Sequence, residues 1–254
     1  MSNIRTVSDT KRAFYTTHTR PISSIYRRVV EELMVEMHLL SVNADFQYDS
    51  IYALGVVTTF DRFMKGYRPN EDLSSIFSAL CKATEGADSA QYRRDAEALL
   101  QAASQLSKDD IGQIIEQAGT SNGSGGVDVL SQLGAIAHAS SFKYSRLFAI
   151  GWLTVLEKVD EAMVKDEAQL ETSVQKLCEL LKLSKEKVDK DLDIYRSNLE
   201  KLQQAQAVLE DMLKADRKKR EDRAQAGDES NNAEVEAAAS SSTSDASESE
   251  GAEV

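Results

Sequence analysis

The sequence predicts an all-α protein: a multi-helix globular bundle, then a long C-terminal helix and a disordered acidic tail. Before residue 214, apolar residues recur at spacings of three and four, and no long segment alternates apolar and polar residues as a strand does. The 254-residue chain has only two prolines, Pro21 and Pro69, so the 185 residues after Pro69 contain none. Because proline inside a helix removes a hydrogen bond and causes a clash, this distribution favours long helices.

Two helices are predicted near the amino terminus. The first covers residues 8–18, with Ser8 as its cap. The second covers about residues 21–41 and starts at Pro21, whose missing N–H group costs nothing in a first turn. Its apolar residues form one wide face and its charged residues lie opposite, which is typical of a helix that packs on a core.

Three further helices are predicted next. The helix over about residues 50–65 stops at Gly66, and Pro69 follows, an arrangement common where helices end. Apolar stripes at helical spacing then run over residues 73–80 and 92–106. Each of these two helices therefore has one side to bury against the bundle.

A sixth, short helix follows Ser107, because the spacing of Ser107 and Asp110 permits a capping box. Residues 119–126 then include four glycines, which leave too much backbone entropy to order cheaply. We expect an open loop there that can hinge two halves of the bundle. The run lacks the Gly-Lys-Ser/Thr ending and the preceding strand of a phosphate-binding loop.

Helices near residues 127–139, 142–158 and 160–182 complete the predicted body. The helix over 142–158 is apolar almost all round, which in a soluble protein means burial on most sides. We therefore expect it to be the central helix.

From Ser184 the apolar spacing changes to alternating steps of four and three, which is a heptad seam. Its members are Val188, Leu192, Tyr195, Leu199, Leu202, Gln206, Leu209 and Leu213. A helix from there to about residue 225 would be roughly 63 Å long at about 1.5 Å per residue, so part of it should project beyond the body. The seam either binds a partner or a second copy, or packs against the chain's own body.

The last part of the chain differs from the rest in its charge. The formal net charge is −12, and residues 227–254 include eight acidic residues and no basic one. This segment has no aromatic residue and cannot bury enough apolar area to offset its ordering entropy, so we expect disorder. The predicted organisation is a helical globular domain over residues 1–183, a heptad-patterned helix over 184–226 and a disordered acidic tail over 227–254.

The sequence shows no catalytic or metal site. None of His18, His38 and His138 has a glutamate three positions before it, as carboxylate-bridged metal sites in helical bundles require, so we expect capping or surface histidines. Cys81 and Cys178 lie 97 positions apart with no histidine nearby, so we expect two reduced, buried thiols. We therefore expect no enzyme activity, no cofactor and no metal. The acidic net charge also argues against a broad nucleic-acid binder.

Apolar runs are too short for a membrane span. The longest, Ile51–Phe60 and Leu147–Leu156, have ten residues each, whereas a span needs about 20. The first residues also lack the apolar stretch of a signal peptide. We expect a protein that is soluble or at most peripheral to a membrane.

One dense basic cluster lies near the end of the long helix. It consists of Arg217, Lys218, Lys219, Arg220 and Arg223. Such a cluster can hold a helix to anionic lipid or another acidic surface, at about 1 kcal/mol per well-placed charge. Alternatively it is solvated and matches the helix macrodipole, which favours basic residues at a C-terminus.

Two stretches of the sequence are distinctive enough to compare with known families. Residues 11–69 begin with KRAFYTTHTRPI and end with FDRFMKGYRP, and residues 143–157 read KYSRLFAIGWLTVLE. Both resemble the signatures of the thylakoid formation protein family, also called the photosystem II biogenesis accessory protein family. The resemblance extends to about residue 215 and does not include the tail.

This resemblance implies a non-enzymatic helical factor of oxygenic phototrophs. Such proteins associate peripherally with thylakoids and support the accumulation of membrane FtsH protease complexes, which remove damaged photosystem II subunits. The implied partners are the FtsH complex, the thylakoid surface and photosystem II assembly intermediates. Plant members carry a chloroplast transit peptide, and its absence here indicates a mature plastid form or a cyanobacterial protein on the cytoplasmic side of the thylakoid membrane.

The family signatures contain no catalytic motif, so no active residue is carried over. Their exposed-looking members are candidates for a docking surface: Arg20, Arg27, Arg28, Asp61, Arg62, Lys65, Tyr67, Arg68 and Arg146. Further candidates are the heptad residues Val188, Leu192, Tyr195, Leu199, Leu202, Leu209 and Leu213. For the first set, the alternative is ion pairing and capping within the chain itself.

Overall fold

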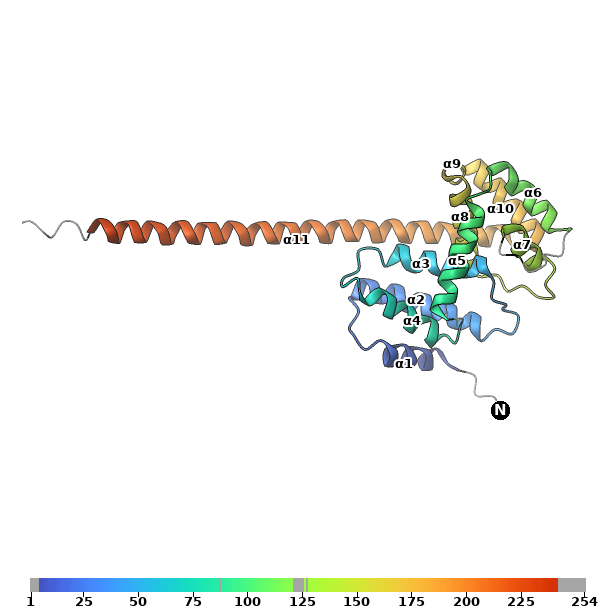
Figure 1. The fold of residues 1–254 in the computed structure, drawn as a ribbon, viewed down its shortest axis with the longest axis horizontal. Helices are drawn as coiled ribbons and strands as arrows, with labels where there is room; N and C mark the ends of the chain where they lie inside the picture. Colours follow the sequence, from blue (N-terminus) through green and yellow to red (C-terminus); the bar gives the residue numbers. More distant parts are fainter. Residues whose placement is uncertain (1–4, 87, 121–125, 127, 242–254) are drawn as a thin grey trace, which may run out of the picture. The chain divides into compact units, whose positions relative to one another are not determined.

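The computed structural model describes residues 5–86, 88–120, 126 and 128–241 and, for some residues after Val208, the backbone alone. Throughout this part the chain forms helices and no strand, which confirms the predicted all-α class. The helices (Figure 1) are α1 (Val7–Thr17), α2 (Ser24–Ser41), α3 (Ser50–Phe63), α4 (Asp72–Ala83), α5 (Ser89–Ala103), α6 (Lys108–Ala118), α7 (Val129–Ala137), α8 (Arg146–Val159), α9 (Glu161–Lys165), α10 (Glu167–Leu181) and α11 (Lys185–Ser241).

The chain divides into two compact units, Met1–Glu200 and Lys201–Val254. The first unit contains α1 to α10 and the start of α11, and the second contains the rest of α11. The domain boundary predicted after residue 183 therefore coincides with the start of a helix, whereas the boundary between the units lies inside that helix.

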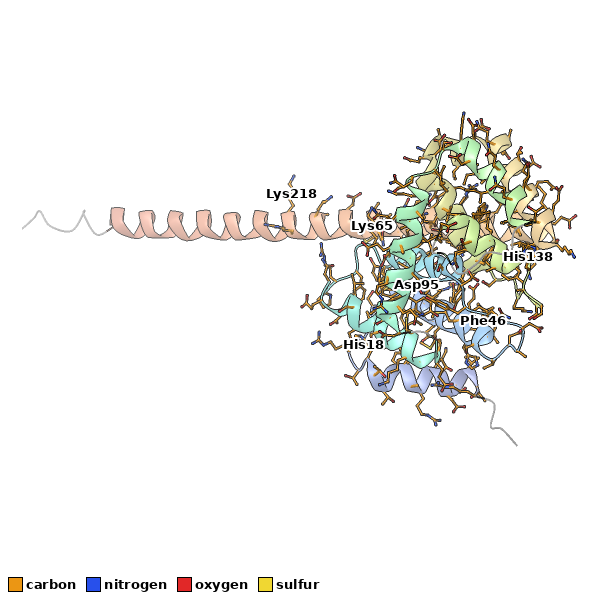
Figure 2. The ribbon with its side chains drawn as sticks, turned by 45° about the vertical axis from the view of Figure 1, so that its right-hand side comes forward. His18, Phe46, Lys65, Asp95, His138 and Lys218 are labelled. Carbon is orange, nitrogen blue, oxygen red and sulfur yellow. The ribbon has the colours of Figure 1, made fainter. Side chains whose placement is uncertain are left out.

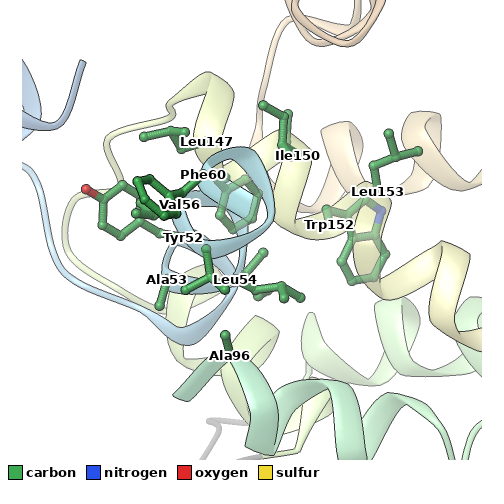
Figure 3. Packing of buried hydrophobic residues seen from close by; sticks show 14 of the residues in the cluster. Tyr52, Ala53, Leu54, Val56, Phe60, Ala96, Leu147, Ile150, Trp152 and Leu153 are labelled. Carbon is green, nitrogen blue, oxygen red and sulfur yellow. The ribbon is translucent and has the colours of Figure 1, made fainter. Parts of the chain in front are cut away.

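The core of the first unit is built around α3 and α8 (Figure 3). Every residue of α8 from Leu147 to Leu156 is buried, which confirms the predicted central helix. α3 is buried along most of its length and packs on α8 and on α5. Large side chains such as Phe60 and Trp152 fill the space around these helices.

Two glycines allow α3 and α8 to approach each other closely. A Cβ atom added to Gly55 would lie 1.7 Å from the carbonyl oxygen of Leu147. One added to Gly151 would lie 1.9 Å from the carbonyl oxygen of Ile51. Backbone of the opposite helix already occupies both positions, so a residue with a side chain does not fit at either without moving a helix.

The starts of α1 and α2 differ from the predicted ones. α1 starts with a capping box formed by Thr6 and Asp9, so the predicted cap, Ser8, lies inside the helix. α2 begins at Ser24 and not at Pro21, and Ser23 directly before it has a non-helical backbone with φ −54° and ψ 142°. Proline fits a first helical turn, but this fit alone does not place a helix start.

Capping aspartates also determine where α6 starts and where α9 and α10 separate. The predicted capping box of Ser107 and Asp110 is confirmed, with 2.7 Å between the hydroxyl and carboxylate oxygens. The helix predicted over 160–182 is two helices, α9 and α10, separated by Asp166. The backbone of Asp166 is extended, and its carboxylate accepts a hydrogen bond from the N–H group of Ala168, which ends one helix and caps the next.

The last helix continues beyond its predicted end. α11 runs to Ser241, whereas the pattern predicted an end near residue 226. Residues 227–241 are rich in alanine and glutamate, which have high helix propensity even where no apolar face is buried. Residues 242–254 of the predicted tail and residues 121–125 of the predicted glycine loop lie outside the described residues.

Two of the three histidines are buried, and for His38 this corrects the expected capping or surface position. His18 and His38 are 2% and 3% exposed; their Nδ1 atoms lie 3.0 Å from the Ser75 hydroxyl and 2.9 Å from the Thr10 hydroxyl. His18 also ends α1, and His138 ends α7, as expected of capping histidines (Figure 2). In the described part of the chain, no group of His, Cys, Asp and Glu is arranged to hold a metal.

The burial of His18 predicts sensitivity to acid. Removal from water lowers the pKa of His18, which Asp72 acts to raise and Arg20 to lower. Because the folded pKa lies below the unfolded one, the folded chain resists protonation and loses stability as the pH falls below about 6.5. Urea unfolding should therefore show a larger loss of stability between about pH 7.5 and about pH 5.5 for the unaltered chain than for His18→Gln. Parallel pH profiles would contradict this prediction.

Both cysteines are buried and free, as predicted. Cys81 lies in α4 and Cys178 in α10. Removal from water raises the pKa of Cys81 to about 12 and that of Cys178 to about 11. Separately, no helix within the described ranges combines the length and the apolar character that crossing a bilayer requires.

Candidate partner-binding surface

Most of the predicted docking residues form ion pairs inside the first unit. This holds for Arg20, Arg28, Asp61, Arg62 and Arg146. Intramolecular pairing, the alternative considered for them, is therefore present. Their contact with a partner stays a prediction.

Arg62 links three helices. From the last turn of α3, its guanidinium donates hydrogen bonds to the Glu157 carboxylate on α8 and, at 3.1 Å, to the Tyr195 hydroxyl on α11. The Arg62 and Glu157 side chains are only 34% and 25% exposed, so water screens the pair less than a pair at the open surface. Arg62 thus holds α3, α8 and the start of α11 together.

A second pair joins the two family-like stretches. Arg146, the first residue of α8, donates to the carboxylate of Glu36 on α2 at 2.6 Å. Removal from water raises the pKa of Glu36, and the nearby Arg146 opposes this shift. The pair needs both partners, because loss of Arg146 would leave a carboxylate that is only 18% exposed without its counter-ion.

Two further pairs fix the segments around α4. Arg20 donates to Asp72, whose carboxylate is buried in the first turn of α4. Asp61 accepts two hydrogen bonds from Arg93 on α5, at 2.5 and 2.8 Å. The Arg93 guanidinium also lies over the Phe77 ring, 4.5 Å from its centre, in a cation–π arrangement.

Tyr67 does not belong to a surface, so the prediction that it is exposed is wrong. Its side chain is 1% exposed, and its ring packs edge to face against Tyr26 with centroids 5.2 Å apart. The largely apolar ring gains more from this packing than from water. Arg27, Lys65 and Arg68 of the predicted set are also exposed; Lys65 is labelled in Figure 2.

The first part of the heptad seam packs on the body of the first unit. Val188, Leu192 and Tyr195 belong to its core, and Leu199 packs against that core as a partly buried residue. For these four residues the intramolecular alternative is realised. Any role in binding a partner stays a prediction.

Aromatic and polar contacts anchor the start of α11. The Tyr195 ring lies 5.8 Å from the Phe63 ring on α3. The Tyr144 hydroxyl donates to Asp191 at 2.9 Å, and the Lys187 ammonium lies 5.1 Å from the centre of the Tyr144 ring. The heptad pattern indicated which side of the helix is buried, but it gave no sign of these contacts.

The second unit contains the rest of the predicted seam. Leu202 is buried, while Val208 and Met212 are 54% and 64% exposed. The side chains of Leu209 and Leu213 lie outside the described residues. Partner binding by this part of the seam therefore stays a prediction.

The basic cluster is described in part. Arg217 and Lys218 are exposed, and Lys218 is labelled on α11 in Figure 2. The side chains of Lys219, Arg220 and Arg223 lie outside the described residues. Contact of the cluster with lipid or an acidic surface stays a prediction.

A groove beside α2 was missed by the sequence reasoning. It encloses about 900 Å³ and is lined by side chains of α1, α2, α8 and α11. Val35 and Leu39 contribute apolar surface to it, and Arg28 and Glu32 contribute charge. The sequence contained a signal, because Val35 and Leu39 are apolar residues of α2 beside the face that packs on the core.

Comparison with known proteins gives close matches. A sequence model of the family described as thylakoid formation protein matches residues 6–224. The protein Thf1 of Gloeothece citriformis is 57% identical over 221 residues, which cover 87% of this chain and 97% of that protein. Thf1 of Nostoc punctiforme is 58% identical over 226 residues, covering 89% of this chain and 94% of that protein.

A solved structure is also similar. The structure of Psb29 superposes with a TM-score of 0.63 at 43% sequence identity. The match covers 78% of this chain and 98% of the Psb29 chain. Similarity in both sequence and fold extends over nearly all of that protein.

Proposed function

The chain belongs to the thylakoid formation protein family, and from this premise we propose that it is a non-enzymatic accessory factor in photosystem II biogenesis and repair. It acts by direct binding to membrane FtsH protease complexes, on the cytoplasmic side of the thylakoid membrane. The observation that carries the proposal is the 57% identity along 97% of a curated Thf1 protein.

Binding alone is sufficient for this role. A protein that binds the assembled complex but not its free subunits stabilises the complex by about 2.7 kcal/mol when present at about 100 times its dissociation constant. The exposed cations Arg27, Lys65 and Arg68 carry charge complementary to an acidic surface of such a complex. Complementary charges of this kind steer association and select partners.

The exposed Arg217 and Lys218 favour a second candidate function. In this alternative, the chain is a peripheral organiser that binds anionic thylakoid lipid through its C-terminal helix. Each well-placed basic residue near an anionic membrane contributes about 1 kcal/mol. The two candidates place the active surface in different units of the chain.

Deleting the gene should lower FtsH abundance severalfold and slow the recovery of photosystem II after strong light, because unbound complexes would be lost. Immunoblots and recovery of oxygen evolution measure the two effects. Returning the full chain should restore both. Unchanged FtsH abundance in the deletion strain would count against the first candidate.

A shortened chain separates the two candidates. A chain ending at Glu200 keeps the first unit and its buried residues Val188, Leu192 and Tyr195, which a cut at Lys182 would remove. We expect it to restore FtsH abundance. If FtsH abundance stays low and the shortened chain leaves the membrane fraction, the lipid-binding candidate is favoured instead.

A further inference from the structure

Exposed apolar side chains of the first unit gather around α2. Five large hydrophobic residues described in that unit are exposed, and three of them, Ile25, Leu39 and Val42, lie on α2 or directly after it. Tyr15 lies on α1 and is hydrogen-bonded to α2, and Ile194 lies on α11, one turn after a residue that lines the groove beside α2. Clustering of this kind is typical of an interaction site.

On the exposed side of α2, three exposed residues are spaced seven positions apart. Ile25, Glu32 and Leu39 are spaced by seven, so they lie within about 40° of one another around the helix and span about 21 Å along it. Val29 and Val35, beside them, are half-buried. A second helix can pack along a stripe with this spacing.

The charge of the groove changes sign along α2. Near the start of α2 its lining has three cations and one carboxylate, from Lys11, Arg27, Arg28 and Glu31, and Glu32 lies in the middle. Near the end of α2 its lining has one guanidinium and two carboxylates, from Arg146, Glu36 and Asp191. One end of the groove is therefore net positive and the other net negative.

We propose that α2 of a second copy of this chain occupies the groove, antiparallel to the first α2, in a two-fold symmetric dimer. Antiparallel packing places Ile25 of each copy against Leu39 of the other, and the positive end of each groove meets the negative end of its partner. A two-fold interface uses the same patch twice, so the patch must be complementary to itself. Parallel packing would bring ends of like charge together.

The middle of the interface is also compatible with this arrangement. Glu32 of one copy would meet Glu32 of the other, but each is already paired with its own Arg28 at 2.8 Å. Contact along one helix, extended by Tyr15 and Ile194, is small. Interfaces below about 1,200 Å² are weak, so the dimer should form in the micromolar range and dissociate on dilution.

Disulfide trapping tests the orientation. Chains carrying Ile25→Cys and Leu39→Cys are purified separately, then oxidised alone and as a mixture. Only the mixture should give a linked dimer, because residues 25 of the two copies would be about 21 Å apart, far beyond disulfide reach. The natural cysteines, Cys81 and Cys178, are 1% and 3% exposed and do not interfere. A link in Leu39→Cys alone, or none in the mixture, would overturn the antiparallel dimer.

Sedimentation equilibrium over a concentration series tests the association itself. Leu39→Glu should weaken the dimer by about tenfold or more, which corresponds to about 1.4 kcal/mol. Met212→Glu is the matched control, because Met212 is 64% exposed and lies in the second unit, and it should leave the dimer unchanged. An unaltered chain that stays monomeric at every concentration would overturn the proposal and leave the groove to a different partner.

Discussion

Gly151→Ala is expected to lower the free energy of unfolding by about 3 kcal/mol, the upper end of the usual range for overpacking. The added methyl group would lie 1.9 Å from the carbonyl oxygen of Ile51. Backbone cannot turn aside as the end of a flexible side chain can, so α3 and α8 would have to separate. Gly55→Ala, at 1.7 Å from the Leu147 carbonyl oxygen, should cost at least as much.

Gly112→Ala is the matched control for both glycine variants. A Cβ atom there would meet only the Lys176 ammonium, at 3.3 Å. Gly112 lies inside α6, where alanine is favoured over glycine by up to about 1 kcal/mol, so this variant should be as stable as the unaltered chain or more stable. Urea unfolding compares the three. Equal stability of Gly151→Ala and Gly112→Ala would mean that the central helices do not cross this closely.

Tyr195→Ala should cost about 3 kcal/mol, the usual loss when a buried aromatic side chain is truncated. Tyr195 is 3% exposed, and its ring packs on Phe63. Its hydroxyl also accepts a hydrogen bond from Arg62 at 3.1 Å, so the variant removes a partner of the link between α3, α8 and α11. The start of α11 should become more accessible to hydrogen exchange as well.

Two milder variants separate the causes of that loss. Tyr195→Phe keeps the ring and should lose only about 1 kcal/mol, the usual contribution of one hydrogen bond. Val208→Ala removes apolar atoms from the same helix at a residue that is 54% exposed, and should change stability by less than about 0.5 kcal/mol. If Tyr195→Ala were as mild as Val208→Ala, the start of α11 would not be anchored in the core.

Features that depend on neighbours in the sequence were predictable. The capping box of Ser107 and Asp110 joins residues three positions apart, and the burial of α8 follows from its uninterrupted apolar composition. The division at Asp166 is also local, but an aspartate inside a periodic pattern was read as part of one helix. The start of α2 shows that a residue suited to a first turn does not determine where the turn forms.

Features that join distant segments were not predictable. Arg62 and Glu157 are 95 positions apart, and Arg146 and Glu36 are 110 apart, so the sequence pattern could name the arginines but not their partners. The burial of Tyr67 has the same origin, because it lies in the connection after α3 and packs against Tyr26 on α2. Periodicity alone does not report such pairings.

The groove beside α2 was predictable in part. Its apolar lining residues on α2, Val35 and Leu39, were visible in the sequence as apolar positions of that helix. Which apolar residues of α2 stay outside the core depends on α1, α8 and α11, whose side chains line the groove. Apolar residues of a helix that do not pack on the core therefore predict a binding surface but not its limits.

The two buried thiol groups have a consequence for chemical probing. A thiol reacts as its thiolate, and burial keeps both Cys81 and Cys178 protonated and out of contact with reagents at neutral pH. Alkylation of either one therefore requires a local opening, of α4 in one case and of α10 in the other. The rate at which each thiol is alkylated therefore measures how often its helix opens, with one thiol for each of the two helices.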